Sequence, residues 1–264
     1  MFHAVIIGID HYVDEKIPDL RFARADAEAL ANVLDERVEG RRCITTLLDD
    51  EATTARIAGL LTDELPRHVR EDDQVLIFFA GHGSLEVEAT YGEPSIHAVT
   101  HDTAYARLAS TAIDMVTQLA SWVRRLDTRH VGVVIDASFN GTAGGRTFEG
   151  PGLWSGPRTR RLDRISLNRL ALGAQGVLVT ACTDKEAAVE DASRSHGVFT
   201  YHLLERLRRA PDGPLSLPTL YDGVASDVRD ATNGAQCPAF HGTRTASPLF
   251  RLGRNVGAPR LVAV

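Results

Sequence analysis

The sequence predicts an α/β protein whose central sheet is mainly parallel and covered by helices on both faces. Runs of almost unbroken apolar residues, such as VLIFFA at 75–80 and VGVVI at 131–135, are typical of strands buried on both faces. Segments with apolar residues at helical spacing alternate with these runs. In such sheets a ligand site lies beyond the carboxyl ends of the strands.

Five strands are predicted in this alternation. HAVIIGI at 3–9 is an apolar run that stops at an Asp, and RCITTLLDD at 42–50 follows as the second strand. DQVLIFFAGHG at 73–83 is almost wholly apolar and runs into glycines. HVGVVIDASFNG at 130–141 and QGVLVTACTD at 175–184 are the fourth and fifth. The edge where a ligand site is expected therefore carries GHG and DASFNG.

Helices are predicted between and after these strands. The segment at 21–38 has apolar residues at helical spacing and ends in charges, and the segment at 54–65 has a Thr cap. The remaining helices are expected at 111–126, 198–210 and 216–232.

Two stretches interrupt this rhythm. Residues 142–165 are rich in Gly, Pro and Arg, and the segment is too long for an ordinary loop between a strand and a helix. A second irregular stretch is predicted at 84–101, directly after GHG. We interpret the first as a functional or mobile loop.

The composition excludes several classes of protein. The 264 residues are 44% apolar and 24% charged, as in soluble globular proteins, and the net charge of −6 gives no general affinity for nucleic acid or anionic membrane. We find neither a signal peptide nor a membrane span. Cys43, Cys182 and Cys237 are far apart and lack metal spacing. Reduced thiols and a cytoplasmic location are therefore expected.

His82 stands between Gly81 and Gly83 at the end of the third strand. Glycines allow a tight turn and the close approach of a substrate, and the near-neutral pKa of histidine suits general acid–base chemistry. An isolated histidine at such a place is more often a turn residue with a satisfied hydrogen bond. Whether His82 is a catalytic or a turn residue therefore depends on the residues at the end of the fourth strand.

Ser138 lies in DASFNG, at the end of the fourth strand. A nucleophile elbow has glycines two residues before and two after its serine, but here those positions are Asp136 and Asn140. The chain order of that fold fails as well, because His82 precedes Ser138. Ser138 is therefore not the serine of a nucleophile elbow.

GHG, followed by a strand that ends in Asp-x-Ser-x-x-Gly, resembles the caspase–metacaspase clan of cysteine proteases. His82 and Ser138 have the family's order of catalytic His and Cys, and about its spacing of roughly 50 residues. Further similarities lie in AVIIGIDHY, ADAEAL, HGVFTYHLLERL, LYDGVASDV and QCPAF.

The resemblance spans nearly the whole chain. It implies a caspase-like α/β sandwich, with a mainly parallel sheet flanked by helices, as a single domain over 1–264. The part that resembles the large subunit covers about 1–145, the processing loop about 142–165, and the part that resembles the small subunit about 166–264.

Ser138 departs from the family, which carries its nucleophilic cysteine at this position. A thiol is partly ionised near neutral pH and strongly nucleophilic, whereas a hydroxyl is neither. Three interpretations compete: a deliberate Cys→Ser substitution that silences self-cleavage, a natural pseudoprotease, and an active serine variant. The retained His82, Asp136 and Gly141 favour the first.

The resemblance also implies a substrate pocket. Metacaspases hold Arg or Lys with carboxylates, and Asp26 and Asp136 match their pocket acids. Asp26 is equally well explained as a charge at a helix N-terminus. Asp102 resembles another acidic position, although a plain loop Asp is the favoured interpretation. The family's oxyanion hole implies the backbone N–H groups of Gly83 and residue 138.

The resemblance gives the arginine-rich loop a role, because family members are often cut between their two subunits. A protease specific for basic residues could be processed there, although a solvated loop without processing remains an alternative. The candidate processing residues are Arg146, Arg158, Arg160, Arg161 and Arg164.

Two classes of function follow from the resemblance. The first is an endopeptidase that cleaves proteins after Arg or Lys, with a role in bacterial defence or cell suicide and an upstream activating protease as a further partner. The second is a pseudoprotease that binds or regulates proteins. We assign no cofactor or metal. Calcium dependence is known in metacaspases, but the acidic runs at 49–50 and 71–73 are equally well explained as solvated turns.

Overall fold

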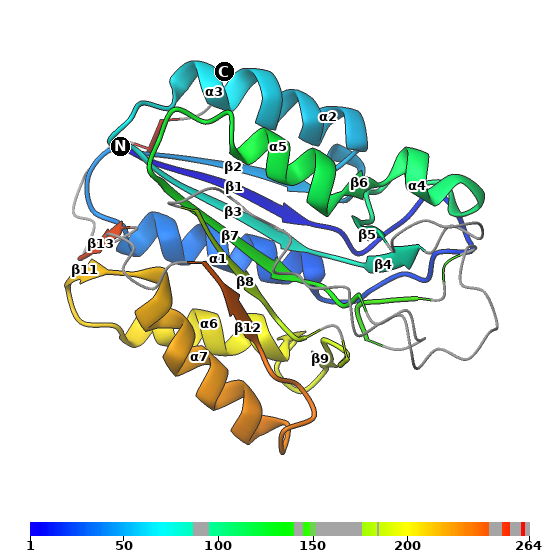
Figure 1. The fold of residues 1–264 in the computed structure, drawn as a ribbon. Coiled ribbons are helices and arrows are strands. Elements are labelled where there is room, and N and C mark those ends of the chain that lie inside the picture. The colour runs from blue at the N-terminus through cyan, green and yellow to red at the C-terminus, as the bar shows by residue number, and fades with distance from the viewer. Residues whose placement is uncertain are drawn as a thin grey trace.

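The computed structural model describes residues 1–86, 95–139, 145–148, 150, 176–183, 185–242, 250–253 and 260–261. Its central sheet has the strand order β12-β8-β7-β3-β1-β2-β14 (Figure 1). All pairings in it are parallel except the one between β12 and β8, so the predicted mainly parallel sheet is confirmed. The strands are β1 (Phe2–Gly8), β2 (Arg42–Leu48), β3 (Gln74–Ala80), β7 (His130–Asp136), β8 (Gly176–Thr180), β12 (Ala239–His241) and β14 (Arg260–Leu261).

Helices cover both faces of this sheet, as the sequence predicts (Figure 1). The helices α1 (Ala23–Arg37), α6 (Val198–Arg209) and α7 (Leu217–Ala231) lie on one face. On the other lie α2 (Thr54–Gly59), η2 (Leu60–Glu64), α3 (Leu65–His68), η4 (Met115–Leu119) and α5 (Ala120–Val123).

Neighbouring residues of each strand supply the two cores, because successive side chains of a strand point to opposite faces. Ile6 and Phe78 pack with the first group of helices. Ile7 and Phe79, one residue further on, pack with the second group. The unbroken apolar runs in the sequence are thus strands buried from both sides.

Two predictions about the segment before β7 were wrong. Part of the stretch 84–101 is not irregular, since β4 (Gly83–Glu86), β5 (Ser95–Ala98) and β6 (Ile113–Asp114) form a small antiparallel sheet. The helix predicted from 111 begins only at Met115. Asp114 caps it, because its carboxylate accepts hydrogen bonds from the backbone N–H groups of Val116 and Thr117, at 2.8 and 2.6 Å.

Short elements complete the described part of the chain. Two further pairs of strands are antiparallel, β9 (Glu190–Asp191) with β10 (His196–Gly197) and β11 (Gly213–Leu215) with β13 (Phe250–Leu252). The remaining short helices are η1 (Asp49–Glu51), η3 (Tyr105–Arg107) and α4 (Leu108–Thr111).

The start of α1 is held by a carboxylate that lies two residues after the end of β1. The backbone N–H of Ala23 donates to Asp10 Oδ1 at 2.7 Å, so Asp10 caps a helix whose own preceding residue has no capping side chain. Burial raises the pKa of Asp10, and the hydrogen bonds from Ala23 and Arg24 partly oppose this. The cap places Asp26 in the first turn of α1, buried against the sheet.

We predict that Asp10→Ala lowers the free energy of unfolding by about 1 kcal/mol, because it removes the cap of α1. Urea unfolding of the two proteins measures this difference. Asp72→Ala, at an exposed turn, is the matched control and should change the free energy of unfolding by less than about 0.5 kcal/mol. Equal midpoints for Asp10→Ala and Asp72→Ala would contradict the assigned cap.

Candidate active site

The site is built where two neighbouring strands end. In the parallel pair β3 and β7, Ala80 lies opposite Asp136, and the backbone N–H of Gly81 donates to the Asp136 carbonyl at 3.3 Å. His82 and Ser138 each follow two residues after these paired positions. The structure therefore brings the two motifs GHG and DASFNG to the same edge of the sheet.

Two backbone amides at this edge point at one carbonyl oxygen. The N–H groups of Gly83 and Ser138 donate to the carbonyl of Arg146, at 3.0 and 3.1 Å. A side chain at position 83 would collide with the Ser138 carbonyl at 2.3 Å and with the Phe139 ring, so this approach requires glycine. The arrangement can stabilise negative charge on a carbonyl oxygen under attack.

His82 is buried and held in one orientation. Its Nε2 lies 2.7 Å from the Pro18 carbonyl, and its backbone N–H donates to the Tyr12 hydroxyl at 2.9 Å. A carbonyl only accepts, so Nε2 carries the proton and Nδ1 keeps its lone pair. Burial lowers the pKa of His82 to about 4, against the opposing effect of the Pro18 and Arg146 carbonyls. The imidazole is therefore neutral near pH 7, with Nδ1 free of a hydrogen-bond partner among the described residues.

Ser138 is fully buried, and its Oγ accepts a hydrogen bond from the backbone N–H of Ala188 at 2.5 Å. The thiol of Cys182 lies beside it and is 3.7 Å from the Ala137 carbonyl. Burial raises the pKa of Cys182 to about 12, and the hydrogen bond with Ser138 acts against this rise. Cys182 thus stays a thiol at neutral pH and is no ready nucleophile, since the thiolate is the reactive form.

An acidic pocket beside these residues holds the side chain of Arg146. The guanidinium has an exposed fraction of 0%. It forms ion pairs with Asp26, with Asp136 at 2.8 Å and with Glu190 at 3.5 Å. Asp26 and Asp136 were predicted to share a pocket, and here both meet one guanidinium. Arg146 thus presents its side chain to the acids and its carbonyl to the two amides.

Residues from β10 and α6 shape the pocket. His196 Nδ1 lies 2.6 Å from Asp26 Oδ1, and the backbone N–H of Gly197 donates to Asp26 Oδ2 at 3.0 Å. Thr200 Oγ1 donates to Asp136 Oδ2 at 2.5 Å. A Cβ at position 197 would lie 2.8 Å from the guanidinium, so glycine makes room for the side chain of Arg146. These residues belong to the HGVFT run that resembles the family.

The third carboxylate, Glu190, was missed by sequence reasoning. Its side chain also accepts hydrogen bonds from the backbone N–H groups of Arg21 and Phe22, at 3.2 and 3.0 Å, just before α1. Glu190 stands in the charged segment KEAAVEDASR, and nothing in the sequence distinguishes it there from the other charged residues. Only the folded β9–β10 turn brings it to the guanidinium.

The charges of the pocket are tightly linked. Burial raises the pKa of Asp136 to about 6, Arg146 acts against this, and Asp26 adds to it. Burial alone would lower the pKa of Arg146, but Asp136, Asp26 and Glu190 together raise it. The pocket thus gathers more negative than positive charge and favours a bound cation.

Other candidate residues lie elsewhere. Asp102 accepts hydrogen bonds from the backbone N–H of Thr54 at 2.8 Å and from Thr100 Oγ1 at 3.0 Å. It thereby joins a turn to the start of α2. The candidate processing residues Arg158, Arg160, Arg161 and Arg164 lie outside the described residues.

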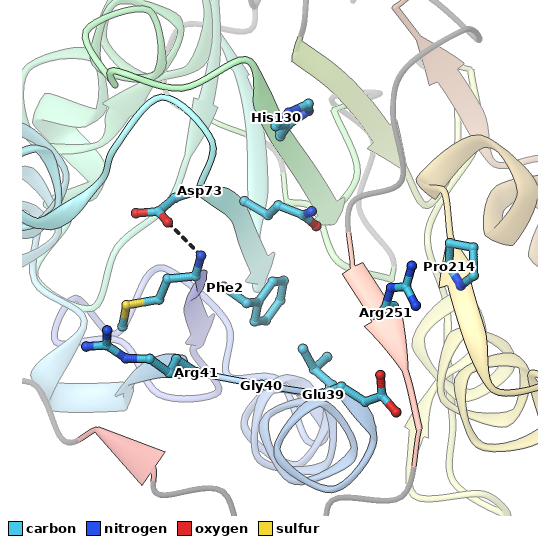
Figure 2. A pocket seen from close by; sticks show the side chains of 11 residues that line it. Phe2, Glu39, Gly40, Arg41, Asp73, His130, Pro214 and Arg251 are labelled. Atoms are coloured by element: carbon cyan, nitrogen blue, oxygen red, sulfur yellow. Dashed lines mark hydrogen bonds and ion pairs between the residues drawn. The ribbon is translucent and has the colours of Figure 1, made fainter.

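A separate hollow lies at the opposite edge of the sheet, by the amino ends of β1, β3 and β7 (Figure 2). Asp73 forms an ion pair with the amino group of Met1 at 2.6 Å. Figure 2 shows Asp73, Glu39, His130 and Arg251 around the same space. This hollow shares no lining residue with the site around Arg146.

Among the described residues, no group of three or more His, Cys, Asp or Glu side chains is arranged to hold a metal ion. Within the same residues, every helix is too short or too polar to cross a bilayer.

The fold defines a caspase-like scaffold. A family model described as the caspase domain, peptidase family C14, matches residues 1–250. The chain therefore belongs to the caspase-domain family, whose activity at the family level is that of cysteine peptidases on protein substrates. None of the curated proteins matches the chain in sequence.

Two solved structures share the fold. A protein from Geobacter sulfurreducens has 17% identity and a TM-score of 0.64, over 92% of this chain and 94% of that one. Caspase-1 from Spodoptera frugiperda has 13% identity and a TM-score of 0.57, over 93% of this chain and 88% of that one. At these identities the likeness concerns the fold alone.

We predict that Arg146→Gln lowers the free energy of unfolding by about 3 kcal/mol at pH 8, because buried carboxylates lose their cation. The loss should be smaller at pH 5. A carboxyl with a raised pKa in the folded state contributes stability at low pH, which is lost as the pH rises from about 4 through its folded pKa. Without Arg146 that pKa lies above the present value of about 6.

Urea unfolding of both proteins at pH 5 and pH 8 measures the difference. Arg125→Ala, on an exposed side chain, is the control and should change little at either pH. An Arg146→Gln loss that shrinks as the pH rises would contradict the assigned charges of the pocket.

Proposed function

We propose that the chain is a caspase-family endopeptidase that cleaves proteins after Arg or Lys. Its nucleophile would be a cysteine at position 138, for which Ser138 stands in here. The observation that carries the proposal is Arg146. Its guanidinium pairs with Asp26, Asp136 and Glu190, while its carbonyl accepts from Gly83 and Ser138. One arginine thus makes both sets of contacts that cleavage after arginine requires, which favours the Arg146–Thr147 bond as a substrate bond.

The proposal gives each of these groups a role in the reaction. Nδ1 of His82 takes the proton of a thiol at position 138, and the sulfur forms a bond to the carbonyl carbon. The amides of Gly83 and residue 138 stabilise the oxyanion. His82 then protonates the leaving amine as the C–N bond breaks. Water hydrolyses the thioester, which restores the thiol and releases a carboxylate.

The surroundings of His82 favour a thiol over a hydroxyl as the natural nucleophile. Its Nε2–H bonds to the carbonyl of Pro18, a neutral backbone group. Serine proteases orient their histidine with a carboxylate, which also stabilises the imidazolium. One neutral imidazole suffices for a thiol, so we infer that the chain with Ser138 is inert or nearly so.

The second candidate is a natural pseudoprotease that binds or regulates proteins. It is favoured by the Ser138 hydroxyl, which accepts a hydrogen bond from Ala188 while the site is filled by the chain's own arginine. Activity of the cysteine variant separates the two candidates.

Activation by cutting within 142–165, by the protein itself or by an upstream protease, is part of the proposal. Arg146 is the processing residue that the contacts support. A role in bacterial defence and the effect of calcium stay predictions from the resemblance.

We predict that Ser138→Cys increases hydrolysis of an arginyl peptide by at least about 100-fold, because it restores a thiol beside a neutral imidazole. The measurement uses paired fluorogenic peptides that differ only in Arg or Asp before the cleaved bond. The aspartyl peptide should remain uncleaved, since its carboxylate meets three others.

Three variants in the Ser138→Cys background test the assigned roles. His82→Ala should abolish hydrolysis. Asp136→Asn should reduce kcat/KM for the arginyl peptide far more than Asp102→Asn, because Asp136 contacts the Arg146 guanidinium and Asp102 instead accepts from Thr54. Preference for the aspartyl peptide refutes the pocket, and comparable activity of the Ser138 chain refutes the stand-in role.

We predict that the Ser138→Cys chain is cut between Arg146 and Thr147, which intact-mass spectrometry detects. Arg146→Gln should prevent that cut without creating one elsewhere in 1–150. Cutting that proceeds unchanged in the Arg146→Gln protein would show that another bond is the substrate.

A further inference from the structure

The chain that follows Arg146 continues along the catalytic residues. Thr147 forms a parallel β-bridge with Gly83, at the start of β4. Phe148 comes next, and its side chain is buried, with only 4% of the residue exposed. If Arg146 precedes the cleaved bond, Thr147 and Phe148 occupy the places of the first and second residues after it.

The ring of Phe148 lies against two aromatic side chains. Its centroid is 5.3 Å from that of His82, edge to face at 79°, and 6.1 Å from that of Tyr105. Tyr12 contacts His82 as well, with the centroids 5.2 Å apart. The catalytic imidazole is therefore flanked by Tyr12, which belongs to the scaffold, and by Phe148, which belongs to the substrate-like segment.

The ring of Tyr105 forms one wall of the space that Phe148 fills. Tyr105 is held by contacts that do not involve Phe148. The backbone N–H of Tyr105 donates to Asp14 Oδ2 at 2.8 Å. Lys16 Nζ lies 5.8 Å from the centre of the Tyr105 ring. Tyr105 therefore keeps its place when another peptide replaces the chain's own segment.

We propose that His82 and Tyr105 form a subsite for an aromatic side chain at the second position after the cleaved bond. The substrates are then proteins in which an arginine is followed, two residues later, by a large aromatic residue, as in Arg146-Thr147-Phe148. This inference rests on the proposed function and adds to it the residue class recognised beyond the bond. Binding is favoured because the aromatic ring is transferred out of water. The bound ring also excludes water from one side of the catalytic imidazole.

The test uses the Ser138→Cys protein and internally quenched peptides of one sequence around Arg-Thr-X. The second residue after the arginine is Phe in one peptide and Ala in the other. We expect kcat/KM to be about 10-fold or more higher for the Phe peptide, as for a hydrophobic side chain that enters a fitted pocket.

Tyr105 provides the matched pair of variants. Tyr105→Ala removes the wall and should bring the ratio of the two kcat/KM values close to one. Tyr105→Phe keeps the ring and should keep the ratio. A ratio that survives Tyr105→Ala, or equal rates for the two peptides in the Ser138→Cys protein, overturns the subsite while cleavage after arginine stands.

If Ser138→Cys hydrolyses no arginyl peptide, the proposed function fails and binding decides the subsite. Fluorescent forms of the same two peptides are titrated onto the Ser138 protein with Arg146→Gln and Phe148→Ala, in which the chain's own cation no longer fills the acidic pocket and its own ring no longer fills the subsite. Binding of the Phe peptide that is about 10-fold tighter supports the subsite, and equal affinity overturns it.

Discussion

The guanidinium of Arg146 is the point on which the arrangement of the site depends. It is buried among carboxylates from three separate parts of the chain: α1, the end of β7 and β9. Buried ions are costly unless each is paired, so these segments are stable in their places only while a cation lies between them. The same side chain fixes where its backbone carbonyl lies, between the amides of Gly83 and Ser138. The charge balance of the pocket and the backbone geometry at the ends of β3 and β7 therefore depend on the same residue, Arg146.

If the chain is the proposed peptidase, the segment around Arg146 is both a model of its substrate and a barrier to it. The imidazole of His82 is neutral and dry while Arg146 and Phe148 cover it. Any peptide that enters has to displace contacts of equal quality, made by a segment already tethered to the site, whose effective concentration is high. Specificity and latency then have the same physical origin.

The sequence predicted what depends on side-chain pattern and missed what depends on backbone or on tertiary contact. Apolar runs predicted β3 and β7, and the motifs after them predicted a site at their shared edge, because parallel strands end together. Resemblance alone connected Asp26 with Asp136. The Pro18 carbonyl that orients His82 leaves no mark in a sequence. In the sequence, Glu190 looks like any surface acid. The helix predicted from 111 begins after its capping residue Asp114, although the helical spacing of apolar residues starts before it.

The pairing of β7 with β8 has a consequence for a chain cut after Arg146. The first fragment would hold β1, β2, β3 and β7, and the second would hold β8, α6 and α7, yet the two share one sheet and one apolar core. Such a product does not fall apart into two chains. It becomes a heterodimer by proteolysis, whose unfolding is a bimolecular equilibrium and whose melting temperature therefore rises with protein concentration.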